Sequence, residues 1–291
     1  MKYIKITQKD DIYPKKLLQI KRSPKELYVA GNYELLNEKQ SVAIIGSRDC
    51  TEYGRKYANY FSEELSKKGI CIVSGMAIGI DALAHIGAVE NKGRTIAVLG
   101  GGFDNIYPKQ NEWLFHKILE NGGCVITEHA PNVDIDMRNF PKRNRIVSGL
   151  SDIVLVVEAE YRSGTSITAG YAKEQGRTVC CIPGNIENGH SIGTNRLIQE
   201  GAKLILKPNE IIEILENTNI SISENQDKVK KEIPKGCEEI YSIIKTSPMH
   251  INDICKKMKK NAKEVAQIIT LLELEDLVEQ IQGNKYKVKE K

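Results

Sequence analysis

Short apolar runs recur between residues 41 and 206, with helix-like stretches between them. The runs are rich in β-branched residues and continuously apolar, which is typical of strands that are covered on both faces. They are Val42–Ile45, Ile70–Val73, Thr95–Leu99, Cys124–Thr127, Ile153–Val157, Thr178–Ile182 and Leu204–Leu206. Helical patterns occur at 52–68, 79–91, 111–121, 165–175 and 194–200. This alternation predicts an α/β fold with a doubly wound, mostly parallel sheet.

The pattern changes towards both ends of the chain. Residues 1–40 are interpreted as an N-terminal extension, and residues 41–216 as the α/β domain. Residues 217–235 have few large apolar side chains and many polar ones, which favours a linker. In residues 236–291, helical patterns at 238–245, 251–259 and 263–274 precede a hairpin that turns at Gly283-Asn284. Three helices and a hairpin predict a small winged-helix domain.

Glycine and small polar residues follow most of the predicted strands. The turns that matter most are Gly46-Ser47-Arg48, Ser74-Gly75 and Ser163-Gly164-Thr165. Because the carboxyl ends of parallel strands share one edge of a sheet, we expect these turns to lie together. Their backbone N–H groups and the helix N-termini behind them are suited to anions. Tight packing explains any one turn equally well, but their recurrence favours a long anion-binding rim.

Residues 138–145 carry four cations and no acid, beside an aromatic ring. The segment contains Arg138, Phe140, Lys142, Arg143, Asn144 and Arg145. We predict a basic loop between two strands. Cations neutralise phosphates and flat groups stack on bases, so such a loop suits a single nucleic-acid strand. A solvated turn is the alternative for the run alone, and Phe140 either stacks on a base or anchors the loop in the core.

Composition narrows the class of protein only a little. The net charge of the 291 residues is 42 − 38 = +4, which permits nucleic-acid binding without arguing for it. No run approaches the roughly 20 apolar residues of a membrane span, and the N-terminus lacks the pattern of a signal peptide. The seven cysteines include no C-x-x-C, and several lie in strand-like runs. We therefore expect a cytoplasmic protein without a membrane span, with Cys180 and Cys181 buried on alternate sides of a strand.

The motifs of several enzyme classes are missing from the sequence. It contains no P-loop, no dinucleotide-binding fingerprint and no nucleophile elbow. His85 has no carboxylate or thiol partner at a fixed spacing, and Asp81 is better suited to beginning a helix than to acting as a base. We therefore predict no catalytic residues, no cofactor and no metal.

Several motifs, in one order, resemble the DNA-processing protein A family, DprA or Smf. They are Gly46-Ser47-Arg48 with Tyr53-Gly54, Ser74–His85, Ala97–Asn111, Phe140–Ile146, Val157–Ala159 with Ser163–Ala169, and Pro183-Gly184 with Gly193–Ala202. The resemblance covers roughly residues 13 to 215, and the C-terminal winged helix is also similar to one found in many members. Members often carry a sterile-alpha-motif domain before this part, where this chain has only about 40 residues.

The resemblance implies an extended Rossmann-like domain that binds single-stranded DNA, forms a homodimer, protects incoming DNA and helps load the RecA recombinase during natural transformation and recombination. Ser47, Arg48 and the segment Phe140–Arg145 match the family's DNA-contacting pocket, and Gly75, Gly164 and Asn195 match its glycine-rich rim. The family has no established catalysis. Pairing of three or four phosphates with Arg48, Lys142, Arg143 or Arg145 would give a salt slope of roughly −2 to −3.

Two other interpretations stay open at this point. The chain could be a nucleotide-processing enzyme of the lysine-decarboxylase-like phosphoribohydrolase type, although residues 166–168 lack the acid that such sites use. It could also be an adaptor that acts through its winged helix. That domain has ten lysines and nine acidic residues, so its charge is nearly balanced. The weak positive charge favours a partner-binding role for the domain over recognition of the DNA major groove.

Overall fold

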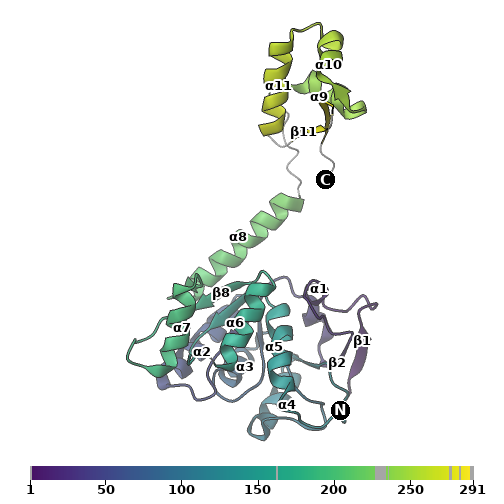
Figure 1. Ribbon diagram of the computed structural model, residues 1–291. Coiled ribbons are helices and arrows are strands. Elements are labelled where there is room, and N and C mark those ends of the chain that lie inside the picture. Colours follow the sequence, from purple (N-terminus) through teal and green to yellow (C-terminus); the bar gives the residue numbers. More distant parts are fainter. Residues whose placement is uncertain are drawn as a thin grey trace. The chain divides into compact units, whose positions relative to one another are not determined.

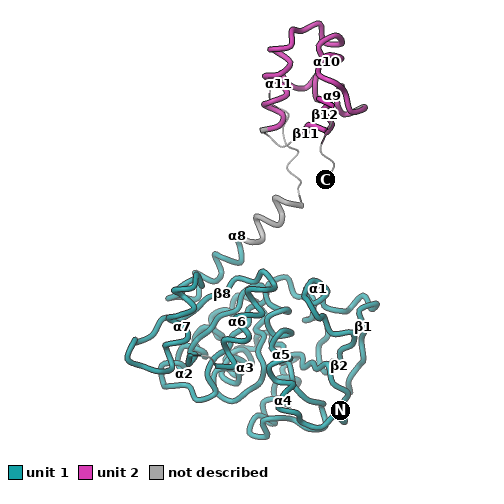
Figure 2. Tube along the Cα trace, in the orientation of Figure 1, with its two compact units in different colours: residues 1–217 teal, residues 218–291 magenta. Residues whose placement is uncertain are grey.

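The computed structural model describes residues 2–161, 163–226, 234, 236–274, 277–281 and 283–288. The chain divides into two compact units, residues 1–217 and residues 218–291 (Figures 1 and 2).

The larger unit is built on a nine-stranded sheet. Its order is β1-β2-β6-β5-β4-β3-β7-β8-β9, and all neighbours from β6 to β9 are parallel. Only β1 and β2 are antiparallel. The strands are β1 (Ile4–Thr7), β2 (Glu26–Gly31), β3 (Ser41–Ile45), β4 (Cys71–Ser74), β5 (Thr95–Val98), β6 (Cys124–Thr127), β7 (Ile153–Val156), β8 (Thr178–Cys181) and β9 (Lys203–Leu204). The expectation of a doubly wound, mostly parallel sheet is confirmed.

Helices cover both faces of this sheet (Figure 1). On one face lie α1 (Lys15–Leu18), α5 (Asn139–Gly149), α6 (Gly164–Glu174) and α7 (Gly189–Gln199), with the short helix η1 (Tyr33–Asn37). The other face is covered by α2 (Glu52–Lys67), α3 (Ile80–Glu90), α4 (Glu112–Glu120) and the start of α8 (Pro208–Gln226). The short helix η2 (Lys109–Asn111) precedes α4.

Adjacent strand residues enter different cores because side chains alternate along a strand. In β3, Ala43 and Ile45 pack against the α5–α6 side, whereas Val42 and Ile44 pack against α2 and α3. Cys180 and Cys181 are likewise buried in opposite cores, which confirms their alternate burial. Burial raises the pKa of each thiol to about 12, so both are inert apolar groups.

Residues 1–40 are an integral part of the larger unit. They supply β1, α1, β2 and η1, and the side chains of Tyr13 and Leu17 are fully buried. Helix α8 extends into the segment interpreted as a linker, as far as Gln226. Residues 227–233 and 235 lie outside the described residues.

The smaller unit has the elements of a winged helix. Helices α9 (Glu238–Thr246), α10 (Ile251–Met258) and α11 (Ala262–Leu274) enclose one apolar core with the strands β10 (Met249–His250), β11 (Val278–Ile281) and β12 (Lys285–Val288). The strand order is β10-β12-β11. Gly283 and Asn284 both have positive φ, as the tight hairpin turn requires.

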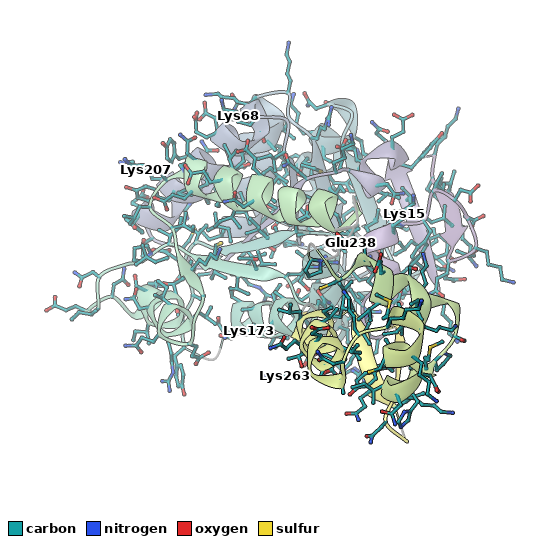
Figure 3. All side chains as sticks on the ribbon, turned by 90° about the horizontal axis from the view of Figure 1, so that it is seen from above. Lys15, Lys68, Lys173, Lys207, Glu238 and Lys263 are labelled. Carbon is teal, nitrogen blue, oxygen red and sulfur yellow. The ribbon has the colours of Figure 1, made fainter. Side chains whose placement is uncertain are left out.

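Charged side chains are distributed widely over the larger unit. Lys15, Lys68 and Lys207 are exposed at its periphery (Figure 3). A local concentration of free charge, rather than the net charge, must therefore define any binding site. In the part of the chain that is described, no helix combines the length and apolarity needed to cross a membrane.

Candidate nucleic-acid interface

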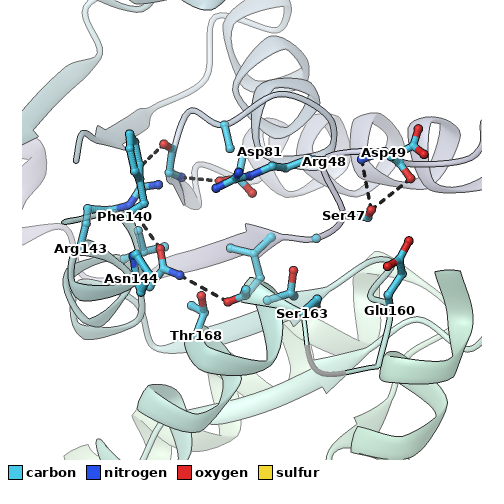
Figure 4. A pocket seen from close by; sticks show the side chains of 18 residues that line it. Ser47, Arg48, Asp49, Asp81, Phe140, Arg143, Asn144, Glu160, Ser163 and Thr168 are labelled. Atoms are coloured by element: carbon cyan, nitrogen blue, oxygen red, sulfur yellow. Dashed lines mark hydrogen bonds between the residues drawn. The ribbon is translucent and has the colours of Figure 1, made fainter. Parts of the chain in front are cut away.

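A pocket of about 400 Å³ opens at the carboxyl edge of the sheet, where β3 and β7 lie side by side (Figure 4). The strand order reverses here, since β4 lies on one side of β3 and β7 on the other. Open α/β sheets bind their ligands at this switch point. The turns after β3, β4 and β7 line the pocket together with the first turns of α5 and α6.

Arg48 is the exposed cation of this pocket. It lies in the turn after β3, and no ion pair or hydrogen bond engages its guanidinium among the described residues. Ser47 contributes to the same turn, where its hydroxyl donates to the carbonyl oxygen of Asp49 at 3.1 Å. Arg48 is therefore available to an anion from solution.

The N-terminus of α6 forms another wall of the pocket. Ser163, Gly164, Thr165 and Thr168 line it, and no side chain caps the first turn of the helix. The hydroxyl oxygen of Ser163 is buried and has no hydrogen-bond partner in the described part of the chain. Uncapped N–H groups and a free hydroxyl at a helix N-terminus favour a negatively charged ligand.

The basic segment forms a helix, so the prediction of a loop is wrong. Residues from Asn139 belong to α5, and Pro141 lies in its first turn, where proline is tolerated. Successive helical residues point about 100° apart. The four cations of residues 138–145 are consequently directed to different sides.

Arg143 is buried beneath the pocket and is only 3% exposed. Its guanidinium donates to the carbonyl oxygens of Gly75 and Val98 and lies 6.0 Å from the centre of the Phe140 ring. Burial lowers the pKa of Arg143 to about 10, which still leaves the group charged at neutral pH. Arg143 thus connects α5 to the ends of β4 and β5, and its donors are largely used.

Asp81 is the buried acid on the far side of Gly75. Its carboxylate accepts a hydrogen bond of 3.2 Å from the N–H of Gly75. Burial raises the pKa of Asp81, against the opposing effect of Arg143. A Cβ at residue 75 would lie 2.6 Å from the Arg143 guanidinium and 2.7 Å from the Asp81 carboxylate, so any other residue here would displace these two groups. The backbone N–H of Gly75, expected to face the DNA, is occupied by Asp81.

The remaining cations of α5 do not line the pocket. Arg145 makes a two-pronged ion pair with Glu128, at 2.6 and 2.8 Å, and its side chain is 11% exposed. Burial raises the pKa of Glu128, but the hydrogen bonds and the positive charge of Arg145, with smaller contributions from His129 and Lys142, together lower the pKa. Arg138 is exposed and pairs with Asp136. Lys142 is exposed but lies outside the pocket lining.

Phe140 has the environment of an anchor. It is 8% exposed and its ring lies 5.4 Å from that of Tyr107. Tyr107 itself is 40% exposed and borders a small apolar depression with Ile78 and Pro108, beside Arg48. The sequence motifs gave no reason to single out Tyr107, although it lies within the family-like motif Ala97–Asn111.

Three other residues were expected at the DNA-binding site, and they lie at different positions relative to the pocket. Asn144 lines it. Ser74 is buried and its hydroxyl donates to the carbonyl of Ile44 at 2.7 Å, so it supports the sheet. The side chain of Asn195 exchanges two hydrogen bonds with the backbone of Gly184 and does not line the pocket. His85 is fully buried against Thr95, with a pKa lowered to about 3 by burial, and has no place at the site.

Comparison with known proteins identifies the family. A family model described as DNA recombination-mediator protein A matches residues 5–216. The chain belongs to this family. A second model, the DprA winged helix domain, matches residues 236–284. The resemblance inferred from the motifs is therefore confirmed for both units.

Relatives with solved structures share the larger unit. DNA processing protein A from Streptococcus pneumoniae is 40% identical, with a TM-score of 0.69 over 73% of this chain and 74% of that one. The Helicobacter pylori family member, whose structure was described for its single-stranded DNA binding mode, is 31% identical, with a TM-score of 0.68 over 75% and 97%.

Two curated proteins are also similar in sequence to this chain. DNA processing protein DprA of Bacillus subtilis is 40% identical over 212 residues, which are 73% of this chain and 71% of that protein. Protein Smf of Escherichia coli is 44% identical over 206 residues, but the match spans only 55% of its length.

Proposed function

We propose that this chain binds single-stranded DNA without sequence preference, through the pocket between β3 and β7. The observation that carries the proposal is the position of the free Arg48 guanidinium in the same pocket as the uncapped N-terminus of α6. Both groups recognise phosphate rather than base edges, so the contacts would not depend on sequence. The single-stranded DNA binding described for the Helicobacter pylori relative supports this function.

Stacking would come from Tyr107 rather than from Phe140. The depression between Tyr107 and Ile78 adjoins Arg48, so a base could lie against the exposed tyrosine ring while its phosphate enters the pocket. Phe140 would hold the helix α5 in place. These two roles follow from the exposure of the Tyr107 and Phe140 rings, since only an accessible ring can stack on a base.

The wider role follows from the family. As members of a recombination-mediator family, two copies of this chain would form a homodimer and help load the RecA recombinase onto the bound strand, without catalysis. We carry over loading, dimerisation and a part in natural transformation as proposals that rest on this membership.

The test compares two exposed arginines. Binding of a fluorescent oligothymidine is measured by anisotropy for the wild type, for Arg48→Ala and for Arg94→Ala, whose arginine is exposed, paired with Glu38 and outside the pocket lining. Losing a charge-assisted contact should weaken binding about tenfold in Arg48→Ala, and Arg94→Ala should match the wild type.

Equal affinities of the two variants would refute the assignment of the pocket. Release of free base from nucleoside monophosphates by the wild type would instead favour the phosphoribohydrolase alternative.

A further inference from the structure

The turn that carries Arg48 is held by one residue of the neighbouring strand end, Glu158. The N–H of Ser47 donates to the backbone carbonyl of Glu158 at 2.8 Å. The Glu158 carboxylate accepts from the N–H of Thr51 at 2.9 Å and from the Thr51 hydroxyl at 2.5 Å. Arg48 therefore lies between two attachment points on the same residue.

The Glu158 side chain is 1% exposed, and no cation pairs with it within the described residues. A buried carboxylate is costly unless hydrogen bonds compensate for the lost water. Here the compensation comes from Thr51 and from the N-terminus of α2, where a negative charge is favourable. A Cβ on Gly54, the third residue of α2, would collide with this carboxylate, so a glycine at this position leaves room for it.

We propose that Glu158 is a positioning residue, which fixes the Arg48 turn in the conformation that presents the guanidinium to the pocket. This inference rests on the proposed function of that pocket. Its physical basis is that an exposed arginine on a freely moving turn loses conformational entropy when it binds, whereas a turn already held loses less.

Asp152 offers a matched control at the opposite edge of the same two strands. Its carboxylate accepts from the N–H of Ser41 at 2.8 Å and pairs with Lys16 at 2.7 Å. Glu158 and Asp152 thus tie β7 to β3 at the carboxyl and amino ends respectively. The variants Glu158→Gln and Asp152→Asn each remove one carboxylate charge, and only the first removes it beside the turn that carries Arg48.

The first measurement is amide hydrogen exchange, which does not depend on DNA. Glu158→Gln should accelerate exchange in residues 46–51 by about tenfold, and Asp152→Asn should leave that segment unchanged. Thr51→Val, which removes the hydroxyl donor from the other side, should act in the same direction. Unchanged exchange in residues 46–51 of a folded Glu158→Gln protein would overturn the inference, whether or not the chain binds DNA.

The second measurement is a double-mutant comparison of oligothymidine affinity. Glu158→Gln should weaken binding about fivefold to tenfold when Arg48 is present and less than about twofold in an Arg48→Ala background. Equal losses in both backgrounds would show a general structural role and would also overturn the inference. If Arg48→Ala alone binds as tightly as the wild type, the proposed function fails, while the exchange experiment still decides the role of Glu158.

Discussion

The turn after β3 and the first half of α5 both carry cations and both line the same pocket, yet they differ in what these cations can do. Arg48 is exposed and unpaired among the described residues. On α5, Arg143 is buried against backbone carbonyls and Arg145 is paired with Glu128. The segment with more cations therefore offers the pocket less free charge, because its exposed cation, Lys142, lies outside the lining. The number of cations in a segment therefore indicates how well it can bind an anion only when the partner of each cation is known.

The difference has a simple geometric origin. A turn at the end of a strand projects its side chain away from the sheet, whereas a helix packed on a sheet must direct some residues inward. The cations on α5 point in different directions around the helix axis. Arg143 is buried in the core, Arg145 pairs with Glu128, and Lys142 is exposed to solvent. The following four experiments test this contrast, from the largest expected effect to the smallest.

Replacing Arg143 should produce the largest effect, on stability. In Arg143→Met the carbonyls of Gly75 and Val98 lose their donor and the buried Asp81 loses a neighbouring positive charge. We expect the free energy of unfolding to fall by about 3–5 kcal/mol, measured by urea denaturation. Arg138→Met, at the exposed cation that immediately precedes the helix, should change stability little. A stable Arg143→Met protein that binds DNA poorly would contradict the structural role of Arg143 and indicate that it contacts DNA.

Replacing Arg145 should lower stability without lowering affinity. Arg145→Ala removes two hydrogen bonds to a half-buried carboxylate, so the free energy of unfolding should fall by about 2 kcal/mol. Its affinity for oligothymidine should stay within about twofold of the wild type, because the pair lies outside the pocket. A loss of affinity as large as that of Arg48→Ala would mean that Arg145 leaves Glu128 to bind phosphate.

The buried surroundings of Arg143 also predict a pH dependence through His85. Burial, with a smaller contribution from Arg143, lowers the pKa of His85 to about 3, below its unfolded value. The unfolded chain therefore binds the proton first, and stability that is complete above about pH 6.5 declines as the pH falls towards 3. Between pH 7.5 and 5.5 the wild type should lose about 1.4 kcal/mol more than His85→Gln in urea denaturation. Identical pH profiles would contradict the burial of a neutral imidazole.

The smallest effect concerns Lys142 and the salt dependence. Lys142→Ala should weaken oligothymidine binding by less than about twofold, since its ammonium lies outside the pocket lining. With Arg143 and Arg145 engaged, the plot of log K against log[salt] should have a slope near −1, shallower than the −2 to −3 expected from pairing with three or four phosphates. A slope of −3 would show that these arginines exchange their internal partners for phosphates.

Much of the fold was accessible from the sequence because buried parallel strands are continuously apolar. The parallel strands from β3 to β8 lie where the runs predicted them, whereas the two-residue β9 shares only Leu204 with its predicted run. The antiparallel β1 and β2 were missed. β1 is a four-residue edge strand with one buried residue, and such a pattern differs little from that of a loop.

The candidate site, like the fold, could be predicted from the sequence only in part. The glycine-rich turns and their common edge follow from the alternation of strands and helices, and they correctly bring Arg48, Ser163 and Gly164 into one pocket. The roles of Asn195 and Ser74 could not be foreseen, because their hydrogen-bond partners, Gly184 and Ile44, come from other segments. Glu158 and Tyr107 belong to recognisable motifs, but nothing in those motifs shows which is buried and which is exposed.

The sequence by itself determined the parallel strands, most of the helices between them, the two units and the family, since these depend on local apolar patterns and on motifs in a fixed order. Only the tertiary structure decided which cations remain free. A local pattern fixes the helix or turn that a residue belongs to. The neighbour that neutralises its charge is supplied by segments far away in the chain, as Glu128 is for Arg145 and the ends of β4 and β5 are for Arg143.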